Sequence, residues 1–402
     1  MQEARHVILP GTGAQLLRRE LALAFTQAGL RVTLVDPRHL QDPKHPQRLT
    51  ELLDGEPALL FSVNFQGLYP LRPLLETLER GNGSAAVWCV DNPWNILAGV
   101  RDPRWKRLAI FVTDHSFIKP LSAHGAENVR HLPLAASFEL FTPHAERDAA
   151  FPAPEDMAPF VFVGRSAFPG KENFFAGLDV PETLLDEAGA MRSQGQRPDV
   201  LWWERAMGLT DEVFWPGKKA RRAALGAEEA NLAWRTQCLA AAARAGLSLI
   251  EGKSAGRDCA AVCPGLDIFG DDGWQPLLPQ KARLRSPVDY YARVPGIYAK
   301  ARYSLCLTSL QLPMGLNQRH FDIWAAGGLA LSDATPGLDL FPEELTRPIT
   351  FRRAEDIAMV VEGLERARDA RGLKADWQAC IKAGHTYAHR VRTILERASS
   401  VK

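Results

Sequence analysis

The sequence predicts an α/β protein of two Rossmann-like domains, each with a parallel sheet that helices cover on both faces. Three observations support this prediction. Short apolar runs typical of buried strands alternate with helical stretches along the chain. A proline-rich stretch without periodicity, residues 143–159, divides these elements into two series. The chain also has 402 residues, which exceeds the usual size of a single hydrophobic core.

The first series opens with a β-α-β unit. Residues 6–9 form a short apolar strand, a glycine-containing turn follows at 10–13, and apolar residues then recur at helical spacing. Gly29 ends this helix, and residues 31–35 form the next strand. Further strands are expected at 58–63, 85–90, 108–113 and 129–132.

The second series begins with the buried strand 160–164, which ends in a glycine turn. Residues 181–245 are expected to be mainly helical, and apolar residues from Trp377 to Leu395 indicate a final packed helix. Further strands are expected at 247–250, 266–269, 303–308, 329–332 and 349–351.

These elements predict the domain boundaries. An N-terminal domain covers 1–145 and a linker covers 146–158. A C-terminal domain covers 159–384 with a helical insertion at about 181–245, and a helix at 385–402 packs back. Two sheets of this kind are expected to leave a cleft at the carboxyl ends of their strands, where ligands bind.

The composition excludes several classes of function. The chain is 46% hydrophobic and 24% charged, and its 48 basic and 47 acidic side chains give a net charge of +1. This balance offers no electrostatic basis for binding nucleic acid or an anionic membrane. The chain contains no signal-peptide pattern and no apolar run that could span a bilayer, so we expect no integral membrane segment.

The cysteines indicate the compartment. The six are scattered, and only Cys259 and Cys263 lie close together, without a second pair or a nearby histidine to complete a zinc site. We therefore expect reduced thiols, no bound metal and a cytoplasmic protein.

A glycine turn near the N-terminus is a first candidate site. Gly11 and Gly13 follow a strand and open a helix, so backbone N–H groups could approach a phosphate or a sugar hydroxyl. A dinucleotide-binding turn would have a third glycine where Leu16 stands, although Asp36 has the position of the acidic ribose ligand. The turn could equally be a plain strand-to-helix connection.

Polar side chains also end two later strands of the first domain. Asp91, Asn92 and Trp94 follow one strand and read either as turn residues or as a platform for a sugar or base. Asp114 and His115 follow the next strand. Because an unperturbed histidine has a pKa near neutrality, His115 could act as a general base.

Two segments of the second domain carry features of an anion site. Gly164 and Arg165 end its first strand, with Lys171 six residues later, and the two cations could neutralise a diphosphate. The stronger candidate is the segment 314–333, MGLNQRHFDIWAAGGLALSD. There Gly315 permits close backbone approach, and Asn317 is a suitable N-cap for a helix starting at Gln318.

The dipole and free N–H groups of that helix would favour a diphosphate at its N-terminus. Arg319 lies in the first turn, where the helix dipole disfavours a positive charge, so its presence is best explained by an anionic ligand or a carboxylate partner. Asp322 could accept hydrogen bonds from ribose hydroxyls. The alternative is an ordinary capped helix with a surface ion pair between Arg319 and Asp322.

The segment FDIWAAGGLALSD resembles the donor site of group 1 glycosyltransferases. The longer stretch from VDYYARVPG to FDIWAAGG, with AVWCVDNPW, LPLAAS and HTYAHR, is more specifically similar to the spore-maturation CgeB-type branch. This similarity is patchy over residues 85–140 and dense over 287–392.

The resemblance implies a GT-B fold with an acceptor-side N-terminal domain and a nucleotide-sugar-binding C-terminal domain. It implies a hexosyltransferase-type enzyme that needs no cofactor or metal, with a nucleoside diphosphate sugar as donor and an unidentified glycan, protein or small molecule as acceptor. Asp322 matches the second acid of the family's E-x7-E motif, whereas Met314 stands where the first acid would be. Arg165 and Lys171 resemble the pair that grips the donor diphosphate, with a spacing one residue longer.

The candidate site residues fall into three groups. The catalytic candidates near the acceptor are Asp114, His115 and Asp91. The residues expected to line the cleft are Gly11, Gly13, Asn92 and Trp94. The residues expected to bind the donor are Gly164, Arg165, Lys171, Gly315, Asn317, Gln318, Arg319 and Asp322.

Two other functions stay open: a protein that binds a nucleotide sugar without transferring it, and an NAD(P)-dependent oxidoreductase. His385 and His389 have the helical spacing of a metal pair, but no third ligand is evident, so helix packing is the better interpretation.

Overall fold

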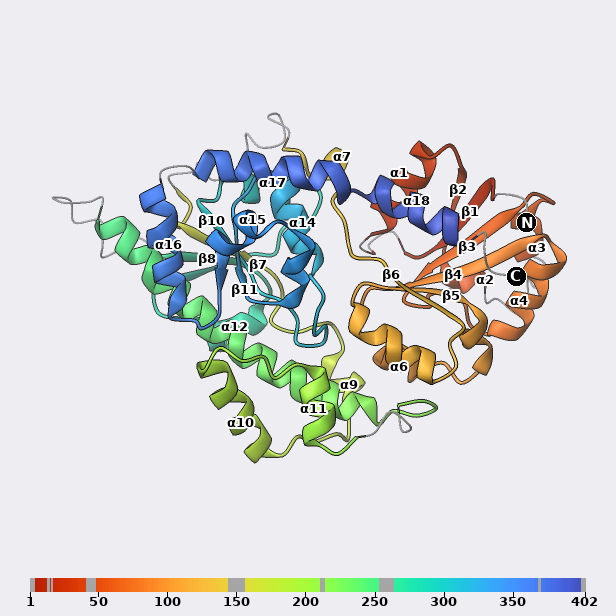
Figure 1. The fold of residues 1–402 in the computed structure, drawn as a ribbon, viewed down its shortest axis with the longest axis horizontal. Coiled ribbons are helices and arrows are strands. Elements are labelled where there is room, and N and C mark those ends of the chain that lie inside the picture. The colour runs from red at the N-terminus through yellow and green to blue at the C-terminus, as the bar shows by residue number, and fades with distance from the viewer. Residues whose placement is uncertain are drawn as a thin grey trace. The chain divides into compact units, whose positions relative to one another are not determined.

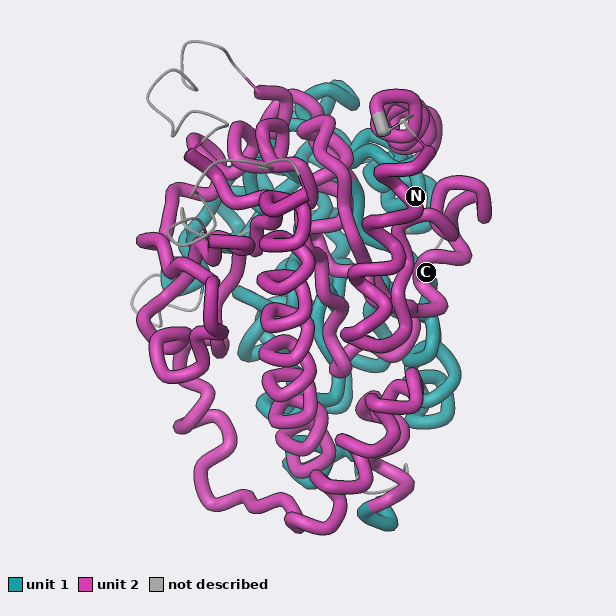
Figure 2. Tube along the Cα trace, turned by 90° about the vertical axis from the view of Figure 1, so that its left-hand side faces the viewer, with its two compact units in different colours: residues 1–135, 207–221, 385–402 teal, residues 136–206, 222–384 magenta. Residues whose placement is uncertain are grey.

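The structure is a computed structural model, and it describes residues 4–12, 15, 17–40, 48–143, 156–209, 214–252, 264–367 and 370–398. The chain divides into two compact units (Figure 2). Unit 1 consists of residues 1–135, 207–221 and 385–402, and unit 2 of residues 136–206 and 222–384. Most of the predicted linker, residues 146–155, lies outside the described residues.

Unit 1 contains a parallel six-stranded sheet of order β2-β1-β3-β4-β5-β6 (Figure 1). Its inner strands are apolar and buried because helices cover both faces of the sheet. Its strands are β1 (His6–Pro10), β2 (Arg31–Val35), β3 (Ala58–Val63), β4 (Gly83–Cys89), β5 (Ala109–Val112) and β6 (Asn128–His131). Its helices are α1 (Arg18–Gln27), α2 (Pro37–Leu40), α3 (Arg48–Leu53), α4 (Leu71–Arg80), α5 (Pro93–Leu97), η1 (Pro103–Arg107), η2 (His115–Phe117), α6 (Ile118–Ala123) and α18 (Tyr387–Ala398).

Unit 2 contains a second parallel six-stranded sheet, of order β12-β11-β10-β7-β8-β9. Its strands are β7 (Phe160–Val163), β8 (Leu266–Phe269), β9 (Ala282–Arg285), β10 (Tyr303–Cys306), β11 (Ala330–Asp333) and β12 (Thr350–Phe351). Its helices are α7 (Phe138–Phe141), α9 (Lys171–Phe174), α10 (Glu182–Ser193), α11 (Val200–Ala206), α12 (Ala220–Glu251), η6 (Asp272–Leu277), α13 (Val294–Lys300), α14 (Gln318–Ala325), η7 (Pro336–Leu340), α15 (Glu343–Thr346), η8 (Arg347–Ile349), α16 (Asp356–Ala367) and α17 (Ala370–Gly384).

The predicted fold class, two parallel α/β sheets, is confirmed, with two differences in detail. The strand predicted at 247–250 is wrong, because helix α12 continues through these residues to Glu251. Strand β9 was not predicted, since Arg283 and Arg285 give it no apolar run. Both arginines pair with the buried Asp267 on the neighbouring strand β8.

The segment predicted as a helical insertion contains α10, α11 and α12, drawn in green in Figure 1. The connection between α11 and α12 belongs to unit 1, where it inserts two aromatic rings. Phe214 packs on Trp94 with 5.4 Å between ring centroids, and Trp215 packs on Trp105 at 5.6 Å. The indole N–H of Trp215 also donates to the carbonyl oxygen of Val100 over 2.6 Å.

The C-terminal stripe of apolar residues belongs to two helices. α17 ends at Gly384, and α18, which begins at Tyr387, packs in unit 1 against α1 and β4. Arg390 on α18 donates to the carbonyl oxygens of Pro133 and Leu134 at 2.7 and 3.0 Å. Among the described residues, no helix is both long and apolar enough to cross a membrane.

Candidate functional site

The end of β7 and the first turn of α14, two segments that we predicted to bind the donor, are in direct contact. Arg319 donates from Nη1 to the carbonyl oxygen of Val163 over 2.8 Å and lies 5.4 Å from the ring centroid of Phe162. A Cβ on Gly164 would lie 2.3 Å from that same Nη1, so only glycine leaves room for the guanidinium. The arginine that opposes the helix dipole is thus directed onto the sheet, and it does not form the ion pair with Asp322 that we considered.

This close approach links Gly164 to the hydrogen bond between Arg319 and Val163. Gly164→Ala is expected to lower the free energy of unfolding by about 1 kcal/mol, the usual contribution of one hydrogen bond, because the end of the Arg319 side chain must move away from the Val163 carbonyl oxygen. Gly189→Ala is the matched control, since Gly189 lies within α10 and a Cβ there would have no atom within 4 Å. Urea denaturation of both variants measures the difference; equal stabilities would contradict the predicted clash.

The N-terminus of α14 is not capped by a side chain. Asn317 has the backbone conformation of an N-cap but makes no capping hydrogen bond. It donates instead from Nδ2 to the carbonyl oxygen of Leu307 over 2.7 Å, and its Oδ1 lies 2.9 Å from Nδ1 of His320. Among the described residues, the backbone N–H of Arg319 has no hydrogen-bond partner. The first turn of α14 therefore keeps N–H capacity for a ligand.

His320 is buried behind this turn, and its Nε2 lies 2.9 Å from Oγ of Ser332. Burial lowers its pKa to about 4. The ring is therefore neutral at pH 7 and links α14 to β11.

The lowered pKa of His320 predicts acid sensitivity. An unfolded histidine binds a proton near pH 6.5, so the stability linked to neutral His320 is complete above pH 6.5 and is lost as the pH falls towards about 4. The expected loss is about 3 kcal/mol at most. His320→Gln should therefore flatten the dependence of unfolding free energy on pH in this window. Denaturation at several pH values tests this, and parallel curves for variant and wild type would refute it.

The two predicted diphosphate cations differ in their surroundings. Arg165 is exposed, and its guanidinium has no partner among the described residues. Its backbone is held in place, because Arg235 on α12 donates to its carbonyl oxygen over 3.1 Å while pairing with Glu228. Lys171 is instead paired with Glu229 at 2.8 Å. Arg165 is thus the cation available to a ligand.

Asp322 is fully buried on α14. Its Oδ1 accepts from Nε2 of Gln318 over 2.7 Å, and its Oδ2 accepts from the hydroxyl of Tyr290. A ribose would have to displace one of these partners. Gly315 is buried in the preceding loop, where a Cβ on Gly337 would lie 3.1 Å from its carbonyl carbon.

In unit 1, Asp114 and His115 follow β5 as predicted. Asp114 is fully buried and accepts from the backbone N–H of Ser116 over 2.8 Å, so it caps η2. His115 is exposed, with its ring centroid 5.2 Å from that of His131. Burial, and then the charge on His115, lower the pKa of His131, whose Nε2 lies 3.2 Å from the carbonyl oxygen of Thr113. His131 was not among the predicted site residues, because it lies at the end of another strand.

The platform predicted after β4 has a structural role. Asn92 accepts from the backbone N–H of Trp94 over 3.0 Å and caps α5. Trp94 is buried between His124 and Phe214, so its ring offers no face to a ligand. Asp91 is exposed beside them and accepts from Nδ2 of Asn64 over 2.7 Å.

The other residues that the sequence suggested as ligands are the glycine turn after β1, Asp36, the histidine pair and the cysteine pair. Gly11 is buried at the end of β1 and donates to the carbonyl oxygen of Val35 over 2.9 Å, whereas Gly13 lies outside the described residues. Asp36, the proposed dinucleotide ligand, pairs with Arg38 at 2.7 Å. His385 lies between α17 and α18, so it does not share a helix with His389. Cys259 and Cys263 are not among the described residues, and no group of three potential metal ligands occurs in the described part of the chain.

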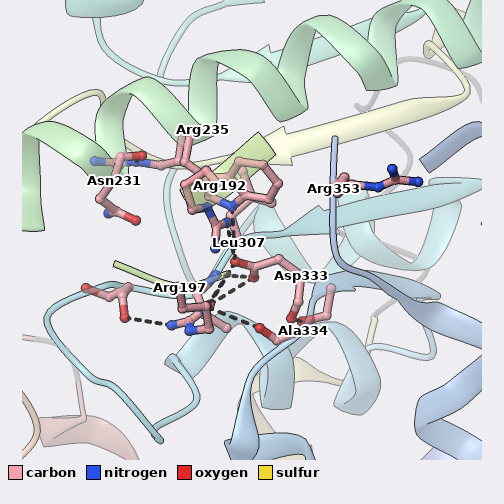
Figure 3. Close-up of polar contacts among 12 residues, drawn as sticks. Arg192, Arg197, Asn231, Arg235, Leu307, Asp333, Ala334 and Arg353 are labelled. Atoms are coloured by element: carbon pink, nitrogen blue, oxygen red, sulfur yellow. Dashed lines mark hydrogen bonds and ion pairs between the residues drawn. The ribbon is translucent and has the colours of Figure 1, made fainter. Parts of the chain in front are cut away.

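A charge cluster that was not predicted from the sequence lies at the carboxyl end of β11, around the buried Asp333. Asp333 contacts the guanidinium groups of Arg192 and Arg197 at 3.4 and 3.3 Å, and Figure 3 shows both arginines directed at it. It also accepts from the indole N–H of Trp234 over 3.1 Å and the backbone N–H of Thr308 over 2.8 Å. Burial lowers the pKa of Arg192 to about 10. These donors come from segments that are distant in sequence, so no local motif marks the cluster.

Solved structures are similar to this chain over nearly its full length. HepE from Anabaena in complex with UDP-glucose has a TM-score of 0.53 at 10% identity, covering 98% of this chain and 99% of its own. Sucrose-phosphate synthase from Thermosynechococcus elongatus has a TM-score of 0.51 at 13% identity, covering 99% of this chain and 100% of its own. This chain has the GT-B fold. The fold expected from the sequence resemblance is thereby confirmed.

A sequence profile provides a second comparison. The family described as glycosyl transferase-like matches residues 237–396, which is less than half of the chain but includes β10, α14 and β11. No curated protein matches the sequence.

Proposed function

We propose that this protein is a glycosyltransferase that moves a hexose from a nucleoside diphosphate sugar to an acceptor. The GT-B fold and the match to a glycosyl transferase-like family support this proposal. HepE is described in complex with UDP-glucose, which makes UDP-sugars the first donors to test. The family motifs in the sequence favour the CgeB-type branch, and the described cysteines are all free thiols, as expected in the cytoplasm.

One observation carries the proposal: β7 and α14 meet where Arg165 is exposed and its side chain has no partner in the part of the chain that the structure describes. The first turn of α14 supplies N–H groups and the positive end of a helix dipole, and Arg165 supplies a full charge. Such groups stabilise the negative charge that develops on a departing diphosphate. Arg319 holds the two segments together and is a positioning residue in this proposal.

The reaction breaks the bond between the anomeric carbon and the diphosphate oxygen. A bond from the anomeric carbon to an acceptor oxygen forms, and the acceptor hydroxyl loses its proton. Helix N–H groups and Arg165 can carry the leaving-group charge, so we propose that transfer proceeds without a metal. For the proton we propose His115 as acceptor, since it is exposed at the end of β5 whereas Asp114 is buried as a cap. Asp91 is the second candidate.

The proposal is tested by incubating the purified protein with UDP-, GDP- and dTDP-sugars and measuring release of the nucleoside diphosphate. We expect slow hydrolysis of one donor, and faster release once a suitable acceptor is present. A donor that binds but is neither hydrolysed nor transferred across many acceptors would identify a non-catalytic nucleotide-sugar-binding protein. Thermal stabilisation by NAD(P) alone would favour the oxidoreductase alternative.

A further inference from the structure

The loop before α14 is held by the helical insertion. This loop, residues 307–317, connects β10 to the N-terminus of α14. Three segments of the helical insertion form hydrogen bonds with this loop. Arg197 donates to Oγ1 of Thr308 over 2.6 Å and to the carbonyl oxygen of Ser309 over 3.4 Å. The backbone N–H of Val200, at the start of α11, donates to the carbonyl oxygen of Leu310 over 2.8 Å. Gln311 in turn donates to the carbonyl oxygen of Ala224 on α12 over 2.6 Å.

One end of the loop is bonded to the sheet, and the other end is bonded to the first. Thr308 donates to Asp333 through its backbone N–H at 2.8 Å and its hydroxyl at 2.9 Å. At the other end, Asn317 donates to the carbonyl oxygen of Leu307 over 2.7 Å and so closes the loop. Because Arg197 also bonds Asp333 and the carbonyl oxygen of Ala334, it joins the loop to the end of β11 (Figure 3).

From these contacts we propose that Arg197 is a positioning residue for the donor site, through which the helical insertion fixes the loop 307–317 and the first turn of α14. This inference rests on the proposed function. A guanidinium suits the task because it can donate to several oxygens in fixed directions, whereas an ammonium cannot match that geometry. The loop is then preorganised before the donor binds, so little of the binding free energy is spent on ordering it.

The charge cluster provides a matched pair of variants. Arg192 and Arg197 both contact Asp333, but their other partners differ. Arg192 donates its other hydrogen bond to the carbonyl oxygen of Gln196, and its guanidinium lies over the ring of Trp234. Among the described residues, none of its hydrogen bonds reaches the loop 307–317. Either arginine can be replaced by methionine, which fills about the same volume as the aliphatic part of the arginine side chain. Asp333 then stays paired with the guanidinium of the other arginine. Both variants are therefore expected to fold.

The test compares Arg197→Met with Arg192→Met in two measurements. The first is the dissociation constant of the nucleoside diphosphate that the wild type binds. We expect Arg197→Met to weaken it about ten-fold or more, since displacement of a binding group by about 1 Å has large effects, and Arg192→Met to change it less than about two-fold. If both variants bind the nucleoside diphosphate equally more weakly, the charge cluster only supports the fold. If Arg197→Met binds it as tightly as the wild type, Arg197 does not position the donor site. Either result overturns the inference.

The second measurement is hydrogen exchange of the amides of residues 307–317 without ligand. It separates this inference from the proposed function. Faster exchange in Arg197→Met than in Arg192→Met is expected, because only the first variant frees the loop. If the wild type binds no nucleotide, the proposed function fails, and with it the donor-site role. The exchange rates still show whether Arg197 holds the loop 307–317 in place. Equal exchange rates in both variants would contradict that role as well.

Discussion

Replacing Asp333 by asparagine is expected to lower the free energy of unfolding by about 3–5 kcal/mol, the usual effect of removing one partner of a buried ion pair. The carboxylate is 1% exposed and contacts two guanidinium groups, of which Arg192 is 4% exposed. Asparagine keeps the shape of the side chain but removes its charge, so the buried Arg192 and the partly buried Arg197 would lose the counter-charge that both contact. Chemical denaturation near neutral pH measures the loss.

Asp339→Asn is the matched control. Asp339 lies a few residues further along the chain, on η7, and is exposed, so its replacement should change stability by about 0.5 kcal/mol at most. Similar unfolding free energies for the two variants would show that the charge of Asp333 does not stabilise the fold by neutralising Arg192 and Arg197.

Replacing Arg165 by alanine is expected to lower the turnover of nucleotide sugar by about 100-fold, which is the usual effect of losing one group that stabilises a developing oxyanion. Arg165 is exposed, and its side chain has no partner among the described residues, so its removal should leave stability nearly unchanged. Turnover and melting temperature measured on the same preparations distinguish the two effects.

Arg366→Ala is the control for this prediction. Arg366 is also an exposed arginine of unit 2, but it lies on α16 in an ion pair with Glu362 at 3.0 Å. Its replacement removes the same charge away from β7 and α14. Wild-type turnover in Arg165→Ala, or an equal loss in both variants, would exclude Arg165 from the donor site.

Much of the fold could be predicted because the strands of a covered parallel sheet are short apolar runs. Strands such as β3 and β7 are apolar, buried and bounded by turn residues, so composition alone locates them. The run 247–250 looks the same locally, but it continues the helix of an alanine-rich segment. Only the length of α12 distinguishes the two cases, and a four-residue window does not contain that information.

The candidate site could be predicted in part. Gly164 and Arg319 were predicted to lie in two separate anion-binding segments, but the sequence does not show that the guanidinium occupies the space above the glycine. Trp94 looked like a ligand platform because the sequence does not show that Phe214, more than a hundred residues later, covers it. Asp333 appeared only as the last residue of the segment 314–333, since its cationic partners come from the distant insertion. Long-range contacts of this kind leave no local pattern.

A crystal structure with bound nucleoside diphosphate would show whether the donor binds at β7 and α14. We expect the diphosphate to lie within hydrogen-bond distance of the Arg165 guanidinium and of the first-turn N–H groups of α14, with Arg319 still bonded to the carbonyl oxygen of Val163. A diphosphate bound elsewhere, for example at Gly11 after β1, would contradict it.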